Sequence, residues 1–220
     1  MVNKKDFFRK VMGQFATGVT VVTARSQGKV AGLTVNAFCS VSLNPPLILV
    51  CVDLNSHTLP FIRESGALAV NILSKEQEHL SSCFATTTEE RYEYFCHASY
   101  HTAVTASPIL DGAIAFIDSR VIAEYPGGDH VIFLAQVEAL GADGQLIFAQ
   151  EENREDRQHA DLPGDNGNRR SIRGTRDTGG VESVTPPEND PLVYFQGKYR
   201  HLGYNYSKPS LEKQPEGVRD

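Results

Sequence analysis

The chain consists mainly of short runs rich in β-branched and other apolar residues, each bounded by turn signals. Such runs cover residues 18–25, 30–43, 47–53, 67–73, 113–125, 130–140 and 191–204. Helices do not alternate with them, and the turn signal Pro-Gly-Gly-Asp directly joins the two long runs. Because a doubly wound fold needs that alternation, the pattern predicts a mainly β protein, a closed antiparallel β-barrel with peripheral helices.

Three stretches have helical patterns. Apolar residues at helical spacing predict a helix over residues 4–16, and residues 75–85 predict another. A third helix is expected before Gly66, with Asn55 or Ser56 as its N-terminal cap. Residues 86–95 are expected to form a loop with one helical turn.

One segment differs sharply from the rest of the chain. Residues 151–190 have few aliphatic residues, no aromatic residues and many charges. Such a segment buries too little apolar area to offset its ordering entropy. The 220 residues therefore predict a single domain, 1–220, with a disordered or flexible insertion at 151–190. The basic cluster in this insertion belongs either to a solvated linker or to a flap over a cofactor phosphate.

Charge and cysteine usage exclude several classes of function. The net charge of −6 argues against nucleic-acid and anionic-membrane binding. No apolar run is long enough for a bilayer, and the first residues lack the apolar core of a secretion signal. The chain is therefore expected to be cytoplasmic. The four cysteines follow no metal-ligand spacing, so they are expected to be buried thiols, and no metal site is predicted.

Two features point to chemistry but leave alternatives open. The polar positions of run 30–43 carry no charge, which fits a planar hydrogen-bonding ligand, a subunit interface or a polar solvent face. Ser56 and Thr58 stand at a predicted helix start, which fits either a phosphate site or an ordinary cap. Asp129 and His130 are sequence neighbours and are not expected to pair with each other.

Five segments, taken together and in order, resemble the short-chain flavin reductase family. They are FRKVMGQFATGVTVVTA, GLTVNAFCSVSLNPPLILVCVD, NSHTLPFIRESGALAVNIL, GDHVIFLAQV and PLVYFQGKYRHLG. The members of this family are small NAD(P)H:flavin oxidoreductases that supply reduced flavin to two-component monooxygenases. The resemblance covers nearly the whole chain except residues 151–190.

The resemblance implies an FMN-binding split β-barrel of Greek-key type, a homodimer with flavin near the subunit interface. The residues that it implies for the flavin ring are Thr34, Val35, Asn36, Ala37, Ser40, Val41 and Ser42, with Cys51, Val52 and Asp53 from the next strand. Those implied for the ribityl phosphate are Ser56, His57, Thr58, Phe84, Ala85 and Arg91. His130 is implied as the catalytic residue at the nicotinamide, with Tyr199 nearby.

The predicted function follows from this resemblance. The protein is expected to oxidise NADH or NADPH, to reduce FMN or FAD, and to pass reduced flavin to a partner monooxygenase. One alternative is a flavoprotein that keeps its flavin and reduces its own substrate. Another is a non-catalytic flavin-binding or electron-carrier protein. The absence of a nucleophile or carboxylate pair fits hydride transfer, since the cofactors supply that chemistry.

Overall fold

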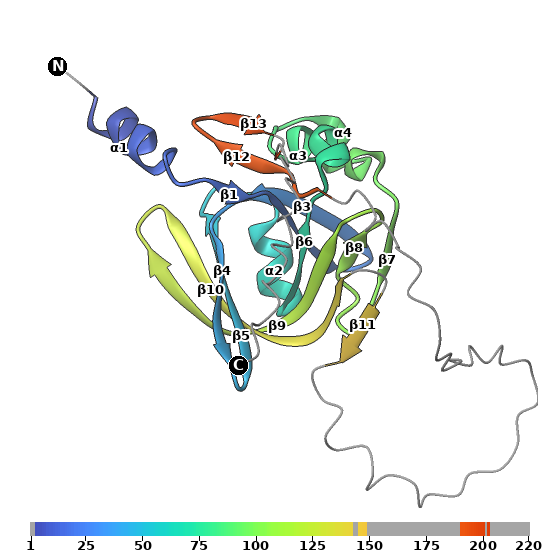
Figure 1. Cartoon of the computed structure of the whole chain (residues 1–220). Coiled ribbons are helices and arrows are strands. Elements are labelled where there is room, and N and C mark those ends of the chain that lie inside the picture. The colour runs from blue at the N-terminus through green and yellow to red at the C-terminus, as the bar shows by residue number, and fades with distance from the viewer. Residues whose placement is uncertain (1–2, 143–144, 149–189, 201, 203–220) are drawn as a thin grey trace, which may run out of the picture.

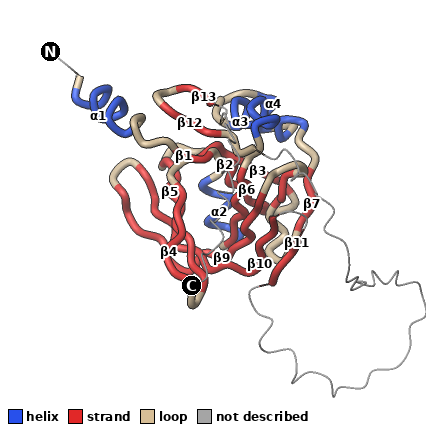
Figure 2. Tube along the Cα trace, viewed as in Figure 1, coloured by secondary structure: helices blue, strands red, loops and turns tan. Residues whose placement is uncertain are grey.

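The computed structural model describes residues 3–142, 145–148, 190–200 and 202. These residues form mainly antiparallel β-sheet with few helices, as predicted (Figures 1 and 2). The helical segments are α1 (Lys4–Met12), α2 (Leu59–Ser65), η1 (Lys75–Gln77), α3 (Glu78–Phe84), α4 (Glu89–Tyr92) and η2 (Phe95–His97). The strands are β1 (Thr17–Gly18), β2 (Thr20–Ser26), β3 (Lys29–Val35), β4 (Phe38–Leu43), β5 (Pro46–Asp53), β6 (Ala67–Ile72), β7 (Tyr100–Thr102), β8 (Pro108–Leu110), β9 (Ala115–Gly127), β10 (His130–Ala142), β11 (Gln145–Phe148), β12 (Val193–Phe195) and β13 (Lys198–Arg200).

One eight-stranded sheet organises the chain. Its strands follow the order β3-β2-β6-β9-β10-β5-β4, and β11 also pairs with β10. The two ends of this path, β3 and β4, are separated in sequence only by Asn36 and Ala37, so the sheet curls back on itself. Among the described residues no ladder joins β3 to β4. The prediction of a closed barrel is therefore wrong at this seam.

The inside of the curl holds the main hydrophobic core. Alternate residues of β10 are buried, as expected for a strand with one apolar face. Ile62 of α2 is fully buried in the same cluster as Val22, Val70 and Phe133. Since full burial of each such side chain contributes about 1.5–3 kcal/mol, this core fixes α2 inside the curl (Figure 1).

A second apolar cluster attaches the end of the chain to the sheet. Phe84 of α3 and Phe95 of η2 pack edge to face, with ring centroids 5.0 Å apart. Leu192 is fully buried in this cluster, and its backbone bonds Val19 (3.1 Å) and Leu73 (3.0 Å). These contacts place the β12–β13 hairpin beside α3 (Figure 1).

Two predicted strands are each divided. The run 30–43 forms β3 and β4, because the chain crosses at Asn36 from one end of the sheet to the other. The run 191–204 forms β12 and β13, which turn at Gln196 (φ 51°) and Gly197 (φ 75°). Two positive φ angles give the hairpin turn that matches strand twist.

The first helix is shorter than predicted and ends at Met12. The predicted insertion, apart from Asp190, lies outside the described residues.

The prediction of four buried thiols is wrong. Cys83 and Cys96 form a disulfide with Cα atoms 6.1 Å apart, and the free Cys39 is exposed. Phe95, Cys96 and His97 all have positive φ angles near 50°, and this left-handed turn directs Cys96 back to the end of α3. The spacing of the cysteines in the sequence does not predict such a turn.

Candidate functional site

A cavity of about 520 Å³ lies between the end of β3, the turn from β5 to α2, the α3–α4 segment and the β12–β13 hairpin. This volume falls within the usual range for small-molecule sites, roughly 300–1,000 Å³. We call it the main cavity. Its lining residues are Val19, Leu33, Thr34, Asn36, Asp53, Asn55, Ser56, His57, Phe84, Ala85, Thr87, Arg91, Tyr92, Tyr194 and Tyr199.

Only part of the predicted ring-binding stretch lines this cavity. Thr34 and Asn36 do, whereas Val35 is buried in the main core. Ala37 lines a separate apolar groove between α1 and β4–β5. The remaining three residues, Ser40, Val41 and Ser42, belong to the edge strand β4, where Ser40 and Val41 are exposed.

The strand β5 divides its predicted residues in the same way. Asp53 lines the main cavity, Val52 is fully buried in the core, and Cys51 lines the α1 groove. Burial raises the pKa of Cys51, and the nearby Cys39 makes a smaller contribution in the same direction. Cys51 is therefore a protonated thiol at neutral pH.

The predicted phosphate turn is present but differs in detail. Ser56 and His57 line the main cavity, whereas Thr58 is fully buried and its hydroxyl has no hydrogen-bond partner in the described part of the chain. Neither Asn55 nor Ser56 caps α2, whose N-cap residue is Thr58. Instead, the Ser56 hydroxyl accepts a hydrogen bond from the Thr58 backbone N–H (3.2 Å), so it orders the turn.

Arg91 of α4 is the most distinctive residue of the cavity wall. It is only 8% exposed, and its guanidinium donates to the carbonyl oxygens of Gly32 (2.9 Å) and Thr86 (2.9 Å). No carboxylate forms an ion pair with it among the described residues. Burial lowers the pKa of Arg91, but a guanidinium stays charged in proteins. The wall thus holds a buried positive charge without an acidic partner.

Phe84 and Ala85, which the resemblance implies for the ribityl phosphate, line the cavity at the end of α3. Phe84 also contacts β3 at Gly32, where a Cβ atom would lie 2.8 Å from the ring. The carbonyl oxygen of Gly32 is also the one to which Arg91 donates. The sequence reasoning gave Gly32 no role.

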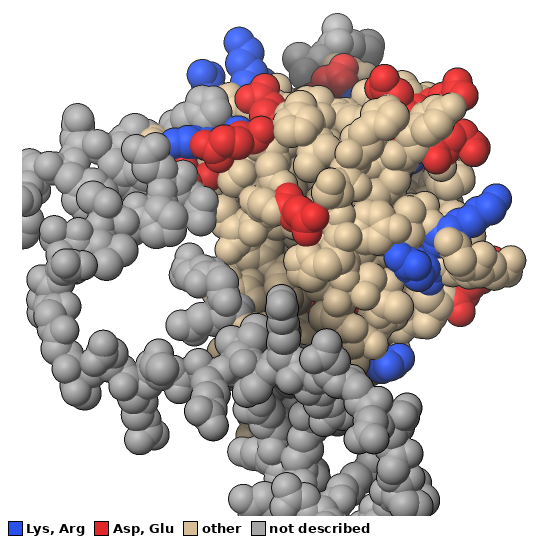
Figure 3. Space-filling model, turned by 90° about the vertical axis from the view of Figure 1, so that its right-hand side faces the viewer, with Lys and Arg blue, Asp and Glu red and all other residues tan. Residues whose placement is uncertain are grey.

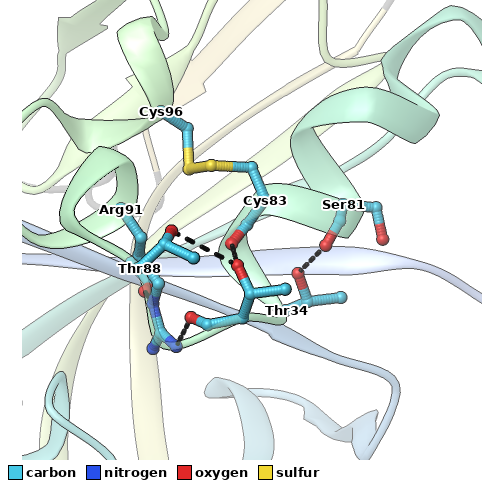
Figure 4. The surroundings of a disulfide bond; sticks show 8 residues. Thr34, Ser81, Cys83, Thr88, Arg91 and Cys96 are labelled. Atoms are coloured by element: carbon cyan, nitrogen blue, oxygen red, sulfur yellow. Dashed lines mark hydrogen bonds between the residues drawn. A yellow bond between two sulfur atoms is a disulfide. The ribbon is translucent and has the colours of Figure 1, made fainter.

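Ser81 of α3 joins β3 to the last hairpin. Its carbonyl oxygen accepts a hydrogen bond from the Thr34 hydroxyl (2.7 Å), shown in Figure 4, and its own hydroxyl bonds the Tyr199 hydroxyl (2.7 Å). Tyr194 packs against Tyr199 with ring centroids 5.7 Å apart. Tyr194 lines both the main cavity and the α1 groove, yet the sequence analysis missed it, since an aromatic residue in a strand is typical of a core.

His130 does not line the main cavity. It pairs in register with Asp53 and therefore lies one strand away from the rim. The expectation that Asp129 and His130 do not pair is wrong, because His130 Nδ1 lies 2.7 Å from Asp129 Oδ1. This hydrogen bond lowers the pKa of Asp129. The backbone bends sharply at this turn, so the side chains of Asp129 and His130 come together although the residues are adjacent in sequence.

The surface gives no sign of a polyanion site on the face in Figure 3, where charges of both signs are scattered. In the described ranges, no cluster of three or more His, Cys, Asp or Glu residues could hold a metal ion. The helices of those same ranges are too short or too polar to cross a membrane.

Comparison with known proteins gives the family. The model of the flavin reductase like domain matches residues 12–155. An NADH-dependent flavin reductase from a Rhodococcus species is 37% identical over 147 residues, 64% of this chain and 80% of that protein. HsaB, the reductase subunit of a flavin-dependent monooxygenase from Mycobacterium tuberculosis, is 35% identical over 133 residues, 60% of this chain and 70% of that protein.

A solved structure agrees with these sequence matches. The structure of the flavin reductase PheA2 is similar, with a TM-score of 0.65 and 31% identity. The match covers 92% of this chain and 100% of the PheA2 chain. The domain match alone extends over more than half of the 220 residues. This chain therefore belongs to the flavin reductase family.

Proposed function

We propose that the protein is an NAD(P)H:flavin oxidoreductase that reduces FMN or FAD and supplies the reduced flavin to a partner monooxygenase. The relatives support this proposal, since one is named as NADH-dependent and another as a monooxygenase reductase subunit. Bound together, nicotinamide and flavin supply hydride transfer. The protein has to bind, orient and shield them.

The observation that carries the proposal is the buried charge of Arg91. Arg91 is only 8% exposed, and its guanidinium donates to two carbonyl oxygens and lies over the Tyr92 ring, 5.3 Å from the ring centroid. Among the described residues, no carboxylate supplies a negative counter-charge. The phosphate of FMN, or the first phosphate of FAD, would supply that charge. Ser56 and His57 line the same cavity and offer further polar groups. We therefore assign the phosphate to this end of the cavity.

Other residues of the lining fit an aromatic ring system. Tyr194 and Tyr199 offer aromatic surface, and Thr34 and Asn36 provide hydrogen-bonding groups. The bond between Tyr199 and Ser81 fixes one wall before any ligand binds. We propose that His130 acts at the nicotinamide from one strand beyond the cavity rim, while Asp129 holds its Nδ1 and leaves Nε2 unoccupied by that contact.

We propose further that the active form is a split-barrel homodimer. The support is α1, which projects from the rest of the chain in Figure 1 and has no buried residue. Phe8 and Met12 line the apolar α1 groove yet remain 65% and 52% exposed. A second copy that covers this face would bury them, and a measured mass of two chains in solution would support this proposal.

We also propose that the protein is cytoplasmic, as its sequence leads us to expect.

Arg91→Gln tests the phosphate assignment. Loss of one hydrogen bond to a charged group costs about 1.5–3 kcal/mol, so FMN affinity should fall by roughly ten- to a hundredfold. Riboflavin lacks the phosphate, and its affinity should change little. Arg25→Gln is the matched control, because Arg25 is half-buried but does not line the cavity. Equal losses for FMN and riboflavin would contradict the assignment.

Turnover distinguishes the proposed activity from its alternatives. The protein is mixed with NADH and a large excess of FMN while NADH absorbance is followed. Many turnovers of free flavin support the proposal. A single stoichiometric reduction supports a flavoprotein that retains its flavin, and no reduction supports a non-catalytic carrier.

A further inference from the structure

The disulfide Cys83–Cys96 closes the part of the chain that forms one wall of the main cavity. Cys83 lies in the last turn of α3 and Cys96 in η2, thirteen positions later. Between them lie five of the residues that line the cavity, which are Phe84, Ala85, Thr87, Arg91 and Tyr92. The covalent link therefore closes the loop that carries Arg91, the proposed phosphate ligand; Figure 4 shows the disulfide and Arg91.

Hydrogen bonds connect Arg91 to the disulfide through one residue. The Arg91 guanidinium donates to the Thr86 carbonyl oxygen (2.9 Å). The Thr86 hydroxyl and backbone N–H in turn donate to the Cys83 carbonyl oxygen, at 2.8 and 3.1 Å. The position of the Arg91 charge thus depends on the backbone at Cys83.

The other end of the loop has an unfavourable backbone conformation. Phe95, Cys96 and His97 have φ angles of 50°, 54° and 52°. L-residues disfavour this region, and three in succession are rare. The link at Cys96 and the packing of Phe95 on Phe84 both hold this turn. Without the link, side-chain packing and two backbone hydrogen bonds, from His97 N–H to the Tyr94 carbonyl (2.9 Å) and from Ala98 N–H to the Phe95 carbonyl (3.1 Å), oppose its relaxation.

The disulfide is also placed where it can react. Cys83 is partly exposed, whereas Cys96 is 9% exposed. Disulfides of proteins in a reducing compartment are usually transient or redox-sensing rather than structural. A thiolate needs access to only one of the two sulfurs to begin exchange.

We propose that the Cys83–Cys96 disulfide is a redox-sensitive constraint on the phosphate-binding wall, so that its reduction by a dithiol weakens binding of phosphate-bearing flavins. The step is a thiol–disulfide exchange. The dithiol gives two electrons and two protons, the Cys83–Cys96 bond breaks to two thiols, and the dithiol becomes a disulfide. The inference rests on the proposed function, because it assumes that the wall binds a flavin phosphate.

The first measurement counts free thiols in the intact protein. Alkylation under denaturing conditions should modify two cysteines, Cys39 and Cys51, before treatment with dithiothreitol and all four after it. Four modified cysteines in protein that has met no reductant would overturn the inference.

The second measurement compares two ligands in two redox states. FMN and riboflavin are titrated by flavin fluorescence into oxidised protein and into protein reduced anaerobically with dithiothreitol. Displacing Arg91 from the phosphate weakens a charge-assisted hydrogen bond, so FMN should bind about tenfold more weakly after reduction. Riboflavin affinity should change by less than about twofold, since it makes no phosphate contact.

Two variants complete the test. The double variant Cys83→Ser, Cys96→Ser should have the FMN affinity of the reduced protein and should not respond to dithiothreitol. Cys39→Ser is the control and should respond as the unmodified chain does. Equal FMN affinity in both redox states, or equal losses for FMN and riboflavin, would refute the redox constraint while leaving the proposed function in place. Failure of the oxidised protein to bind FMN would refute both.

Discussion

Gly32 is the residue whose substitution tests the packing of the cavity wall most directly. In Gly32→Ala the new Cβ would lie 2.8 Å from Phe84 Cε1 and 3.0 Å from Cδ1. Ordinary contact begins near 3.4 Å, so the ring must move by about 0.6 Å, the difference between 3.4 and 2.8 Å. Phe84 is fully buried and packs edge to face on Phe95, so it has little room to move.

The expected cost follows from this overlap. Overpacking a well-packed core typically costs about 1–3 kcal/mol, and the lower chain entropy of Ala in the unfolded state offsets about 0.4–1 kcal/mol of it. Gly32→Ala should therefore lower the free energy of unfolding by about 1–2 kcal/mol. Because Phe84 lines the cavity, FMN should also bind more weakly.

The assay is urea unfolding followed by circular dichroism, with a lower midpoint and an unchanged slope expected. Gly18→Ala is the matched control, since Gly18 is also in a strand and a Cβ there meets nothing within 4 Å. Phe84→Leu should couple with Gly32→Ala, so that the double variant loses less stability than the sum of the single changes. A Gly32→Ala protein as stable as the Gly18→Ala control would refute the reasoning.

Two further substitutions test other contacts near the cavity. Tyr199→Phe leaves the fully buried Ser81 hydroxyl without its partner, so unfolding by urea should show a loss of about 1–3 kcal/mol, whereas the exposed Tyr125→Phe should show none. His130→Ala should raise the pKa of Asp129 toward its ordinary value, because it removes the hydrogen bond that stabilises the charged carboxylate. Carbon NMR of the carboxyl group measures this pKa, and an unchanged value would contradict the contact.

The fold could be predicted where local pattern and tertiary structure agree. The long runs 113–125 and 130–140, joined by a strong turn signal, form β9 and β10 as predicted, and β10 alternates between buried and half-buried residues. A turn was predicted between the runs 18–25 and 30–43, and the chain turns there at Gln27 and Gly28. The same dipeptide at 196–197 was not predicted as a turn, because it lies inside the run 191–204. The seam at Asn36 depends on which strands pair, and local sequence does not contain that information.

The residues of the candidate site, too, could be predicted only in part from the sequence. The resemblance named Arg91, and the structure adds that its charge is buried and has no acidic partner in the described ranges. Thr34 was predicted to face a ligand, and it lines the cavity while also bonding α3. Tyr194 and the disulfide partner Cys96 were missed because they reach the site through a hairpin and a left-handed turn, which only the tertiary structure reveals.

The attachment of the last hairpin has a consequence for how this chain can vary. The backbone of Leu192 is tied to Val19 and Leu73, and Asp190 forms an ion pair with Lys75 at 3.1 Å. On the other side, β11 is paired with β10. Because both flanks are fixed independently by contacts among the described residues, the wall formed by Tyr194 and Tyr199 has its own anchors on the sheet. A change in the number of residues between the two flanks should therefore leave this wall in place.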